Sequence, residues 1–491
     1  MMNYVNSDNM WQIFMIVHYV TMITISAVMV RNHTKRDPIR TMMWVIVLYF
    51  LPVIGLILYI FFGQNYRKTK IFSRKALKDL KYLDRLTKQQ VLMLRKSEIF
   101  EDYPEKTGFK NIMTLLLNNS KAIITEMNSI EMYHTGEKTF EAIKEALLSA
   151  KDHIHMEFYI IEDDKIGNEI KDILIRKAKE GVKVRVIYDD VGSWSLPQRF
   201  IREIRRANGK IKPFMKVRFP FLSSKLNYRN HRKILVVDGN VAFMGGINIA
   251  DRYITGGTFG YWADMHIKLE GESVQSLQAI FMVDWYFVSK EILLRKHKLY
   301  FPDNTVNNRI LIQIITSGPD SDWASIMQAY FSIINSAKHH IYISTPYFTP
   351  NEGVLTAMKT ASLSGVDVRL MLPEKNDSHL VYWSTLSYLD ELMEAGVKVY
   401  LYSKGFNHSK FITADGHLAA VGSANIDMRS FEHNFEVMAI IYDEQTTKQL
   451  ETSFQIDIQN NSKSINPEKW ENRPWYKHAQ EGIAQLLTPL L

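Results

Sequence analysis

The sequence predicts an α/β fold made of two duplicated lobes, each a mixed sheet flanked by helices, preceded by a two-helix transmembrane hairpin. Three observations predict it: a polar motif that occurs twice, a helix–strand order that occurs twice, and two long uncharged runs near the N-terminus. At 491 residues with 46% hydrophobic content, the chain suits a folded protein of several domains.

Composition narrows the classes of function. The chain has no cysteine, which excludes structural disulfides, thiolate catalysis and cysteine-ligated zinc. Its formal net charge of +8 favours anionic partners, either nucleic acid or acidic lipid.

Two uncharged runs predict a membrane hairpin within residues 1–66. They cover residues 11–30 and 42–62, and about 20 helical residues cross a hydrocarbon core. The alternative is a cleaved signal peptide followed by a buried helix. It is disfavoured because the first run lacks a basic n-region and a small-x-small cleavage site.

A basic linker is predicted over residues 67–115. Eleven Lys or Arg and two Asp lie between Arg67 and Lys96. This excess exceeds that of the connector Arg31–Arg40, so the positive-inside rule places the catalytic lobes on the cytoplasmic side. Such a segment also attracts anionic phospholipid headgroups.

The remaining chain repeats one order of elements, which predicts a first lobe over 116–300 and a second over 301–491. A helix, a strand, a helix ending at a glycine and another strand precede the motif in each lobe. The predicted elements are 140–150, 153–161, a helix ending at Gly181 and 182–188, then 330–337, 340–344, a helix ending at Gly365 and 366–372.

The duplicated motif reads His-x-Lys-x-x-x-x-Asp. The first copy is His231, Lys233 and Asp238, and the second is His408, Lys410 and Asp415. Beyond each Asp, at equal spacing, a small residue and an Asn follow: Gly246 with Asn248, and Ser423 with Asn425. Two such strings predict one active site built from two halves.

The residues after each Lys are apolar or small and predict a buried strand. His and Lys two positions apart would then point to one face and reach one pocket. Asp238 and Asp415 complete the motif, and each precedes a glycine in a turn, so a turn-fixing carboxylate is the favoured role for both.

This set of side chains suits chemistry on a phosphodiester. Two Lys and the amides of Asn248 and Asn425 would bind the phosphate oxygens, and small residues at Gly246 and Ser423 would let the backbone approach them. One imidazole can attack phosphorus while the other protonates the leaving oxygen. The ammonium groups already supply positive charge, so no metal or other cofactor is expected.

A histidine nucleophile needs a carboxylate to hold its other ring nitrogen. Asp264 and Glu436 follow the two Asn residues and are the candidates; the alternative is a surface or strand-end carboxylate. The remaining histidines are interpreted as structural, and no His, Asp or Glu cluster has metal-ligand spacing.

These residues resemble the phospholipase D superfamily, whose hallmark is the paired His-x-Lys-x4-Asp motif. The closer resemblance is to bacterial cardiolipin synthases, and it extends over nearly the whole chain. It rests on residues 227–233, 317–320, 345–350 and 425–436, and on 52–56 and 62–65 in the leader.

The resemblance implies phosphatidyl transfer between two phosphatidylglycerol molecules, giving cardiolipin and glycerol through a phosphatidyl-histidine. It implies that His231 attacks and His408 acts as acid and then base, with the reverse assignment open. Anionic phospholipids and the bilayer are the expected partners, nucleic acid is not expected, and the sequence predicts no oligomeric state. The expected location is the cell membrane, as a multi-pass protein.

Two other functions remain open. A hydrolase of the same superfamily would use water as the acceptor, and a non-enzymatic membrane scaffold would retain the fold without activity. The intact motifs disfavour the scaffold.

Overall fold

A computed structural model describes residues 7–31, 38–51, 54–55, 59, 81–217, 227–293 and 297–487. The chain divides into a small compact unit, formed mainly by residues 1–69 and 217–227, and a large one, formed mainly by 70–216 and 228–489. Each is described by itself.

The described residues of the small unit include the helices α1 (Ser7–Arg31) and α2 (Pro38–Phe50). Met22 packs with Trp44, Leu48 and Tyr59 in a small apolar cluster. Within the ranges given above, no helix is both long enough and apolar enough to cross a bilayer. Much of the second predicted span, at 52–53, 56–58 and 60–62, lies outside the described residues, as does the linker from 67 to 80.

A single mixed sheet of fifteen described strands runs through the large unit, in the order β19-β13-β12-β10-β15-β16-β18-β9-β1-β8-β6-β5-β2-β3-β4. The strands of the first half are β1 (Ile124–Tyr133), β2 (His153–Phe158), β3 (Lys183–Asp189), β4 (Lys210–Phe214), β5 (Ile234–Val237), β6 (Val241–Gly245) and β8 (His266–Gly271). Those of the second half are β9 (Arg309–Ser317), β10 (His340–Ser344), β12 (Asp367–Pro373), β13 (Lys398–Tyr402), β15 (Phe411–Ala414), β16 (Leu418–Gly422), β18 (Glu436–Tyr442) and β19 (Ser462–Ser464).

The strand order reads the same outward from the centre of the sheet. There β1 pairs antiparallel with β9, and on each side the strands follow in equivalent order to the parallel pairs β2–β3–β4 and β10–β12–β13. This confirms the predicted α/β class and mixed sheet. The duplicated halves share one continuous sheet.

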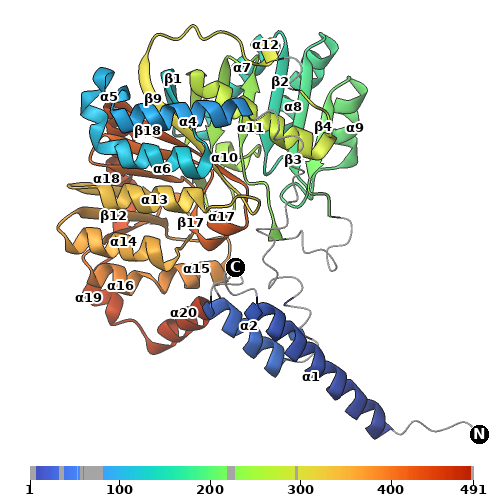
Figure 1. Ribbon diagram of the computed structural model, residues 1–491, viewed down its shortest axis with the longest axis vertical. Helices are drawn as coiled ribbons and strands as arrows, with labels where there is room; N and C mark the ends of the chain where they lie inside the picture. The colour runs from blue at the N-terminus through green and yellow to red at the C-terminus, as the bar shows by residue number, and fades with distance from the viewer. Residues whose placement is uncertain are drawn as a thin grey trace, which may run out of the picture. The chain divides into compact units, whose positions relative to one another are not determined.

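Helices cover both faces of the sheet. On one face of the first half lie α7 (Gly136–Ser149), α8 (Lys165–Lys179) and α9 (Gln198–Arg206). The same face of the second half carries α4 (Lys81–Lys96), α5 (Ile99–Asp102), α6 (Lys110–Ser120), α13 (Ser325–Ser336), α14 (Glu352–Leu363) and α16 (Leu389–Glu394), of which Figure 1 shows α4, α6, α13 and α14 one below another. The opposite face is covered by α11 (Glu272–Ser289) and α18 (Glu444–Asn461).

The short helices are η5 (Pro104–Phe109), α10 (Arg252–Thr255), α12 (His297–Tyr300), α15 (His379–Leu386), α17 (Met428–Glu432) and α19 (Pro467–Glu471), and α20 (Trp475–Leu487) ends the described chain. The helix–strand order predicted before each motif is confirmed in both halves. Gly181 and Gly365 follow α8 and α14 with φ of 95° and 93°, left-handed angles that glycine adopts without strain.

Residues 81–115 pack into the core of the large unit. Leu94, Met113 and Leu116 are fully buried in the same apolar cluster as Ile315 and Ile333 of the second half. This part of the predicted linker therefore contributes to the hydrophobic core.

Candidate active site

Short backbone pairings between the two halves bring the motifs together. One small parallel sheet bridges the two halves: β7 (Tyr261–Ala263) of the first half pairs with β14 (Gly405–Asn407) of the second. A second small parallel sheet, β11 (Phe348–Thr349) with β17 (Ile426–Asp427), lies within the second half. The His408 amide donates to the Ala263 carbonyl at 2.7 Å, and the His231 amide donates to the Phe435 carbonyl at 2.9 Å. Each motif histidine is thus held beside the residue that precedes the other half's candidate carboxylate.

Each histidine ring binds the carboxylate of the opposite half. Nδ1 of His231 lies 2.9 Å from Oε1 and 3.0 Å from Oε2 of Glu436. Nδ1 of His408 lies 2.6 Å from Oδ2 of Asp264. Both carboxylates are buried. Since a carboxylate only accepts hydrogen bonds, Nδ1 carries the proton and Nε2 is the nitrogen left for chemistry.

Burial sets the protonation states of the two rings. It lowers the pKa of His231 to about 4, although the Glu436 charge opposes this. It lowers the pKa of His408 well below the ordinary value, and the charges of Lys410, Lys233 and His231 lower it further. Both imidazoles are therefore neutral at pH 7. The effect of His231 on His408 also places the two rings within one electrostatic environment.

The two carboxylates differ. Burial raises the pKa of Asp264 to about 6, with the Lys410 charge opposing. Burial also raises the pKa of Glu436, but His231, Lys233 and a hydrogen bond from Ser423 together outweigh it and leave the pKa below its usual value. Glu436 is the more firmly ionised of the pair.

The motif lysines are buried beside the histidines. Lys233 Nζ donates to the His231 carbonyl at 2.7 Å, and Lys410 Nζ donates to the His408 carbonyl. Burial lowers the pKa of Lys233 to about 7 and that of Lys410 to about 8. An anionic ligand bound beside them would favour the protonated, positively charged form of both lysines, and the attraction between these charges and the anion would strengthen its binding.

The predicted buried strands 234–237 and 411–414 are confirmed as β5 and β15, but the prediction that His and Lys lie along them is wrong. The strands β5 and β15 begin at Ile234 and Phe411, after the lysines. The preceding segments pair with the other half, and the Arg232 amide binds the Asn230 side chain, as the Ser409 amide binds that of Asn407. These contacts replace strand geometry in aiming both side chains at the site.

The two asparagines are buried at the site in different settings. Asn248 accepts from the Ile160 amide at 3.2 Å and donates to the Tyr253 hydroxyl at 3.0 Å. Asn425 Nδ2 donates to Asp427 at 3.0 Å, while its buried Oδ1 has no protein partner among the described contacts. Binding of a phosphate by either amide stays a prediction.

The small residues contact the two carboxylates that hold the histidines. A Cβ at Gly246 would collide with the Asp264 carboxylate. At the equivalent position, Ser423 Oγ donates to Glu436. The close approach of backbone to phosphate at Gly246 and Ser423 stays a prediction.

The motif aspartates fix turns. Asp238 accepts from the amides of Lys151, Asp152 and His153, each at 2.8 Å. Asp415 accepts from the equivalent amides 338–340 at 2.7–2.9 Å. Both aspartates have φ of 53°. The favoured structural role agrees with this geometry, and catalytic contact does not.

Several site residues were not predicted. The Tyr159 ring lies 4.9 Å from the His231 ring, centroid to centroid, and the Tyr253 hydroxyl lies 3.4 Å from His408 Nδ1. Arg232 pairs with the buried Asp284 and donates to the Glu436 carbonyl at 3.3 Å. The equivalent of Arg232 in the second half is the neutral Ser409, so only the motif that contains His231 has such a charged contact. The position of Tyr159, directly after the buried strand β2, is the one feature of the sequence by which a residue of this group could have been found.

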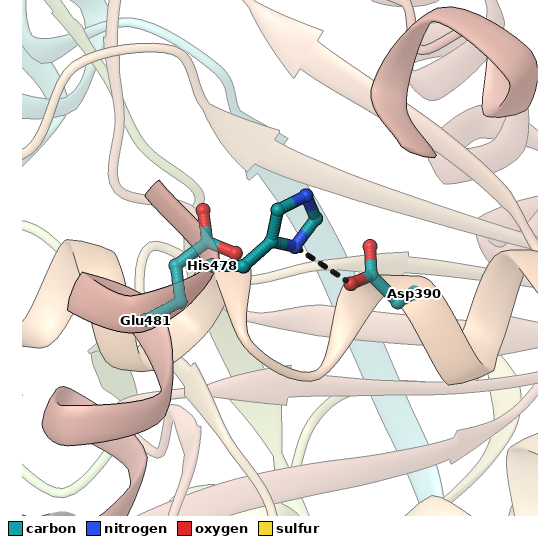
Figure 2. Close-up of side chains that lie close together, drawn as sticks. All are labelled: Asp390, His478 and Glu481. Carbon is teal, nitrogen blue, oxygen red and sulfur yellow. Dashed lines mark ion pairs between the residues drawn. The ribbon is translucent and has the colours of Figure 1, made fainter. Parts of the chain in front are cut away.

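Among the described residues, one group of His and carboxylate side chains could hold a metal ion: Asp390, His478 and Glu481 (Figure 2). Arg473 already pairs with Glu481 at 2.6 Å and 3.0 Å, and Trp470 donates to Asp390 at 2.6 Å. The protein's own guanidinium therefore compensates these carboxylates, and the group is an ion-pair cluster between α16 and α20.

Comparisons with known proteins agree with this geometry. The family described as "Cardiolipin synthase, PLD-like domain" matches residues 143–285 and 330–458, one stretch in each half. The family described as "Phospholipase_D-nuclease N-terminal" matches residues 14–64.

Curated relatives extend the match along the chain. Cardiolipin synthase 2 of Bacillus anthracis is 42% identical over 93% of this chain and 88% of that protein. Cardiolipin synthase of Halalkalibacterium halodurans is 41% identical over 98% and 95%. The crystal structure of phosphatidylserine synthase of Haemophilus influenzae shares the fold, with a TM-score of 0.57 and 16% identity over 78% of this chain and 99% of that one. The chain belongs to the cardiolipin synthase family of phospholipase D-like enzymes.

Proposed function

We propose that this phosphatidyltransferase joins two phosphatidylglycerol molecules into cardiolipin and releases glycerol. The observation that carries the proposal is the pair of neutral imidazoles, each held at Nδ1 by a carboxylate, beside two buried lysines. The relatives named cardiolipin synthase support the choice of substrate.

The reaction proceeds in two displacements at phosphorus. Nε2 of His231 attacks the first lipid, the P–O bond to glycerol breaks, and His408 donates a proton to the departing oxygen. His408 must take up a proton when the phosphate binds. It then removes the proton from a hydroxyl of the second phosphatidylglycerol, whose oxygen displaces His231 and forms cardiolipin. Neither step needs a nucleotide or metal, because one phosphodiester replaces another.

Positive charge around the phosphate comes from the chain itself. Lys233 and Lys410 neutralise the non-bridging oxygens, and Asn248 and Asn425 are the proposed amide donors. The contact of Asn425 with Asp427 supports this role in part, since it uses one N–H of the amide and leaves the second for a ligand.

We also propose that residues 1–66 anchor the enzyme in the cell membrane as a two-span hairpin over 11–30 and 42–62. Both helices of this segment expose large apolar side chains, among them Trp11, Ile16, Ile46 and Phe50. The match of residues 14–64 to a phospholipase D N-terminal family supports the anchor. The linker 67–115 and the lobes 116–300 and 301–491 would then lie on the cytoplasmic side.

Product analysis tests the function. Purified enzyme incubated with labelled phosphatidylglycerol in detergent should yield labelled cardiolipin and free glycerol, with turnover unchanged by a chelator. Formation of phosphatidate in place of cardiolipin would identify a hydrolase and refute phosphatidyl transfer. Complete loss of turnover in chelator would refute the metal-free reaction.

Adducts trapped by rapid denaturation in detergent at mildly alkaline pH, where a phosphorus–nitrogen bond survives, test the assignment of the two histidines. Substrate labelled in the phosphatidyl group should leave label on the wild-type protein and none on His231→Ala. Label retained by His231→Ala and lost from His408→Ala would reverse the roles.

A further inference from the structure

The last helix of the large unit presents its apolar side to solvent. On α20, the exposed fractions of Trp475, Ile483 and Leu486 are 80%, 61% and 70%, and Tyr476 is exposed by half. At helical spacing these residues share one side. The opposite side holds His478 and Glu481, which Figure 2 shows directed toward the protein near Asp390.

A network of charges fixes this orientation. Glu481 is buried and accepts two hydrogen bonds from Arg473, and His478 Nδ1 lies 3.7 Å from Asp390 Oδ2. The Arg473 guanidinium also stacks over the Trp470 ring, 3.5 Å from its centroid. Helices of globular proteins normally bury the apolar stripe and expose the charged one. Turning α20 over would expose the Glu481 carboxylate to water and break its two hydrogen bonds with Arg473.

The neighbouring helix continues the apolar side. The helix α15 packs against α20, and its first residues Leu380, Val381, Tyr382 and Trp383 are only half-buried. A contiguous apolar patch of this kind marks an interaction site on most proteins. We call the exposed sides of α15 and α20 the C-terminal apolar surface.

This surface leads to the active site through the segment before α15. The Asp377 carboxylate accepts from the Tyr347 hydroxyl at 2.7 Å, and its charge raises the pKa of Lys410 against the larger effect of burial. Asp377 lies two residues before α15, so the segment that leads into the C-terminal apolar surface carries a charge that acts on Lys410.

We propose that the C-terminal apolar surface docks the catalytic unit onto the phospholipid bilayer. The proposal rests on the proposed use of bilayer lipids as substrates. Trp and Tyr prefer the headgroup level of a membrane, and amphipathic helices enter it by about 5–10 Å. Ile483 and Leu486 would reach the acyl boundary, with Trp475 and Tyr476 beside the headgroups.

Spin labels test the position of α20 in the full chain. Because the chain has no cysteine, Ile483→Cys and Gln485→Cys each create one labelling site, and Gln485 is exposed near the polar side of the same helix. Leu363→Cys, on α14, is the second control, with an exposed fraction of 73%. In enzyme reconstituted into phosphatidylglycerol vesicles, the label at 483 should be accessible to oxygen and shielded from a water-soluble nickel complex. The two controls should be accessible to the nickel complex.

Two other results of the spin-label measurement would overturn the proposal. Nickel accessibility at 483 equal to that at 363 would mean that α20 faces water. Shielding of 483 from both oxygen and nickel would mean that protein, such as a second copy of the chain, covers the surface.

Activity supplies a second test. The double variant Ile483→Glu with Leu486→Glu should lower turnover of vesicle-embedded phosphatidylglycerol by about tenfold and leave turnover of short-chain substrate in detergent unchanged. Equal turnover of both substrates, at the wild-type level or reduced alike, would refute docking. If wild-type enzyme forms no cardiolipin from either substrate, the proposed function fails, while the spin labels still decide the docking separately.

Discussion

Replacing Glu436 by Gln tests the carboxylate that holds His231. Three donors converge on its two oxygens: His231 Nδ1 at 2.9–3.0 Å, Ser423 Oγ, and Asn434 Nδ2 at 3.2 Å. A Gln side chain offers one acceptor oxygen and a donor NH2, so it cannot satisfy all three. Turned toward His231, its NH2 forces the ring proton onto Nε2, the nitrogen that must attack.

The magnitude follows from the burial of this pair. His231 is neutral in the free enzyme and becomes positively charged as Nε2 bonds to phosphorus, so its buried charge pair with Glu436 forms during the reaction. Removing one partner of such a pair costs about 3–5 kcal/mol, and about 1.4 kcal/mol changes a rate tenfold. If the cost falls on the transition state, kcat for cardiolipin formation should drop by roughly 10² to 10⁴. KM should change little, because the lysines remain.

The assay is initial-rate formation of cardiolipin from labelled phosphatidylglycerol in detergent, with folding checked by circular dichroism. Glu451→Gln is the matched control, because Glu451 binds His340 Nε2 at 2.9 Å outside the site. It should keep wild-type kcat. If Glu436→Gln keeps half of the wild-type kcat or more, the carboxylate does not orient the nucleophile and the reasoning is wrong.

Three further outcomes are expected. Asp238→Ala loses three hydrogen bonds to backbone amides, so unfolding should need about 2–3 kcal/mol less, measured by denaturant titration, with kcat per folded enzyme within twofold of wild type. Gly246→Ala displaces the Asp264 carboxylate and should lower kcat about 100-fold. Gly353→Ala on α14, where the added Cβ makes only ordinary van der Waals contacts, should leave kcat unchanged; equal rates of the two variants would contradict the role given to Gly246. Burial lowers the pKa of Lys233 to about 7 and that of Lys410 to about 8, so both lysines lose their charge as the pH rises through 7 to 8. Inorganic phosphate should therefore raise the Tm of the protein more at pH 6.5 than at pH 9. An equal increase at both pH values, or a larger one at pH 9, would argue against the lysines as the anion site.

Sequence periodicity predicted the elements that depend on local patterns. The helix–strand order, the glycine stops and the duplicated motif follow from spacing within short segments, and the structure confirms them. Asp264 and Glu436 were also identified as partners of the histidines. The crossed pairing was not predicted, because it depends on contacts between distant parts of the sequence. His408 and Asp264 are separated by 144 positions, and His231 and Glu436 by 205.

The errors have a common physical cause. The strand β5 is present as predicted, but it begins at Ile234, and the His231 amide instead binds the Phe435 carbonyl of the opposite half, a contact that local spacing does not reveal. The contact between Gly246 and the Asp264 carboxylate was not predicted, because no local signal indicates that a carboxylate from a later segment fills the adjacent space. The tyrosines and the Arg232–Asp284 pair were missed because their partners are distant in sequence.

The crossed histidine–carboxylate pairs make the two repeats mutually dependent. Each repeat carries one of the two histidines and the carboxylate that binds the histidine of the other repeat. Two separate copies of such a repeat could complete each other only as a two-fold homodimer joined edge to edge, as β1 and β9 are joined here. Fusion into one polypeptide frees the copies to diverge, and the Asp with a glycine in one and the Glu with a serine in the other are a record of that divergence.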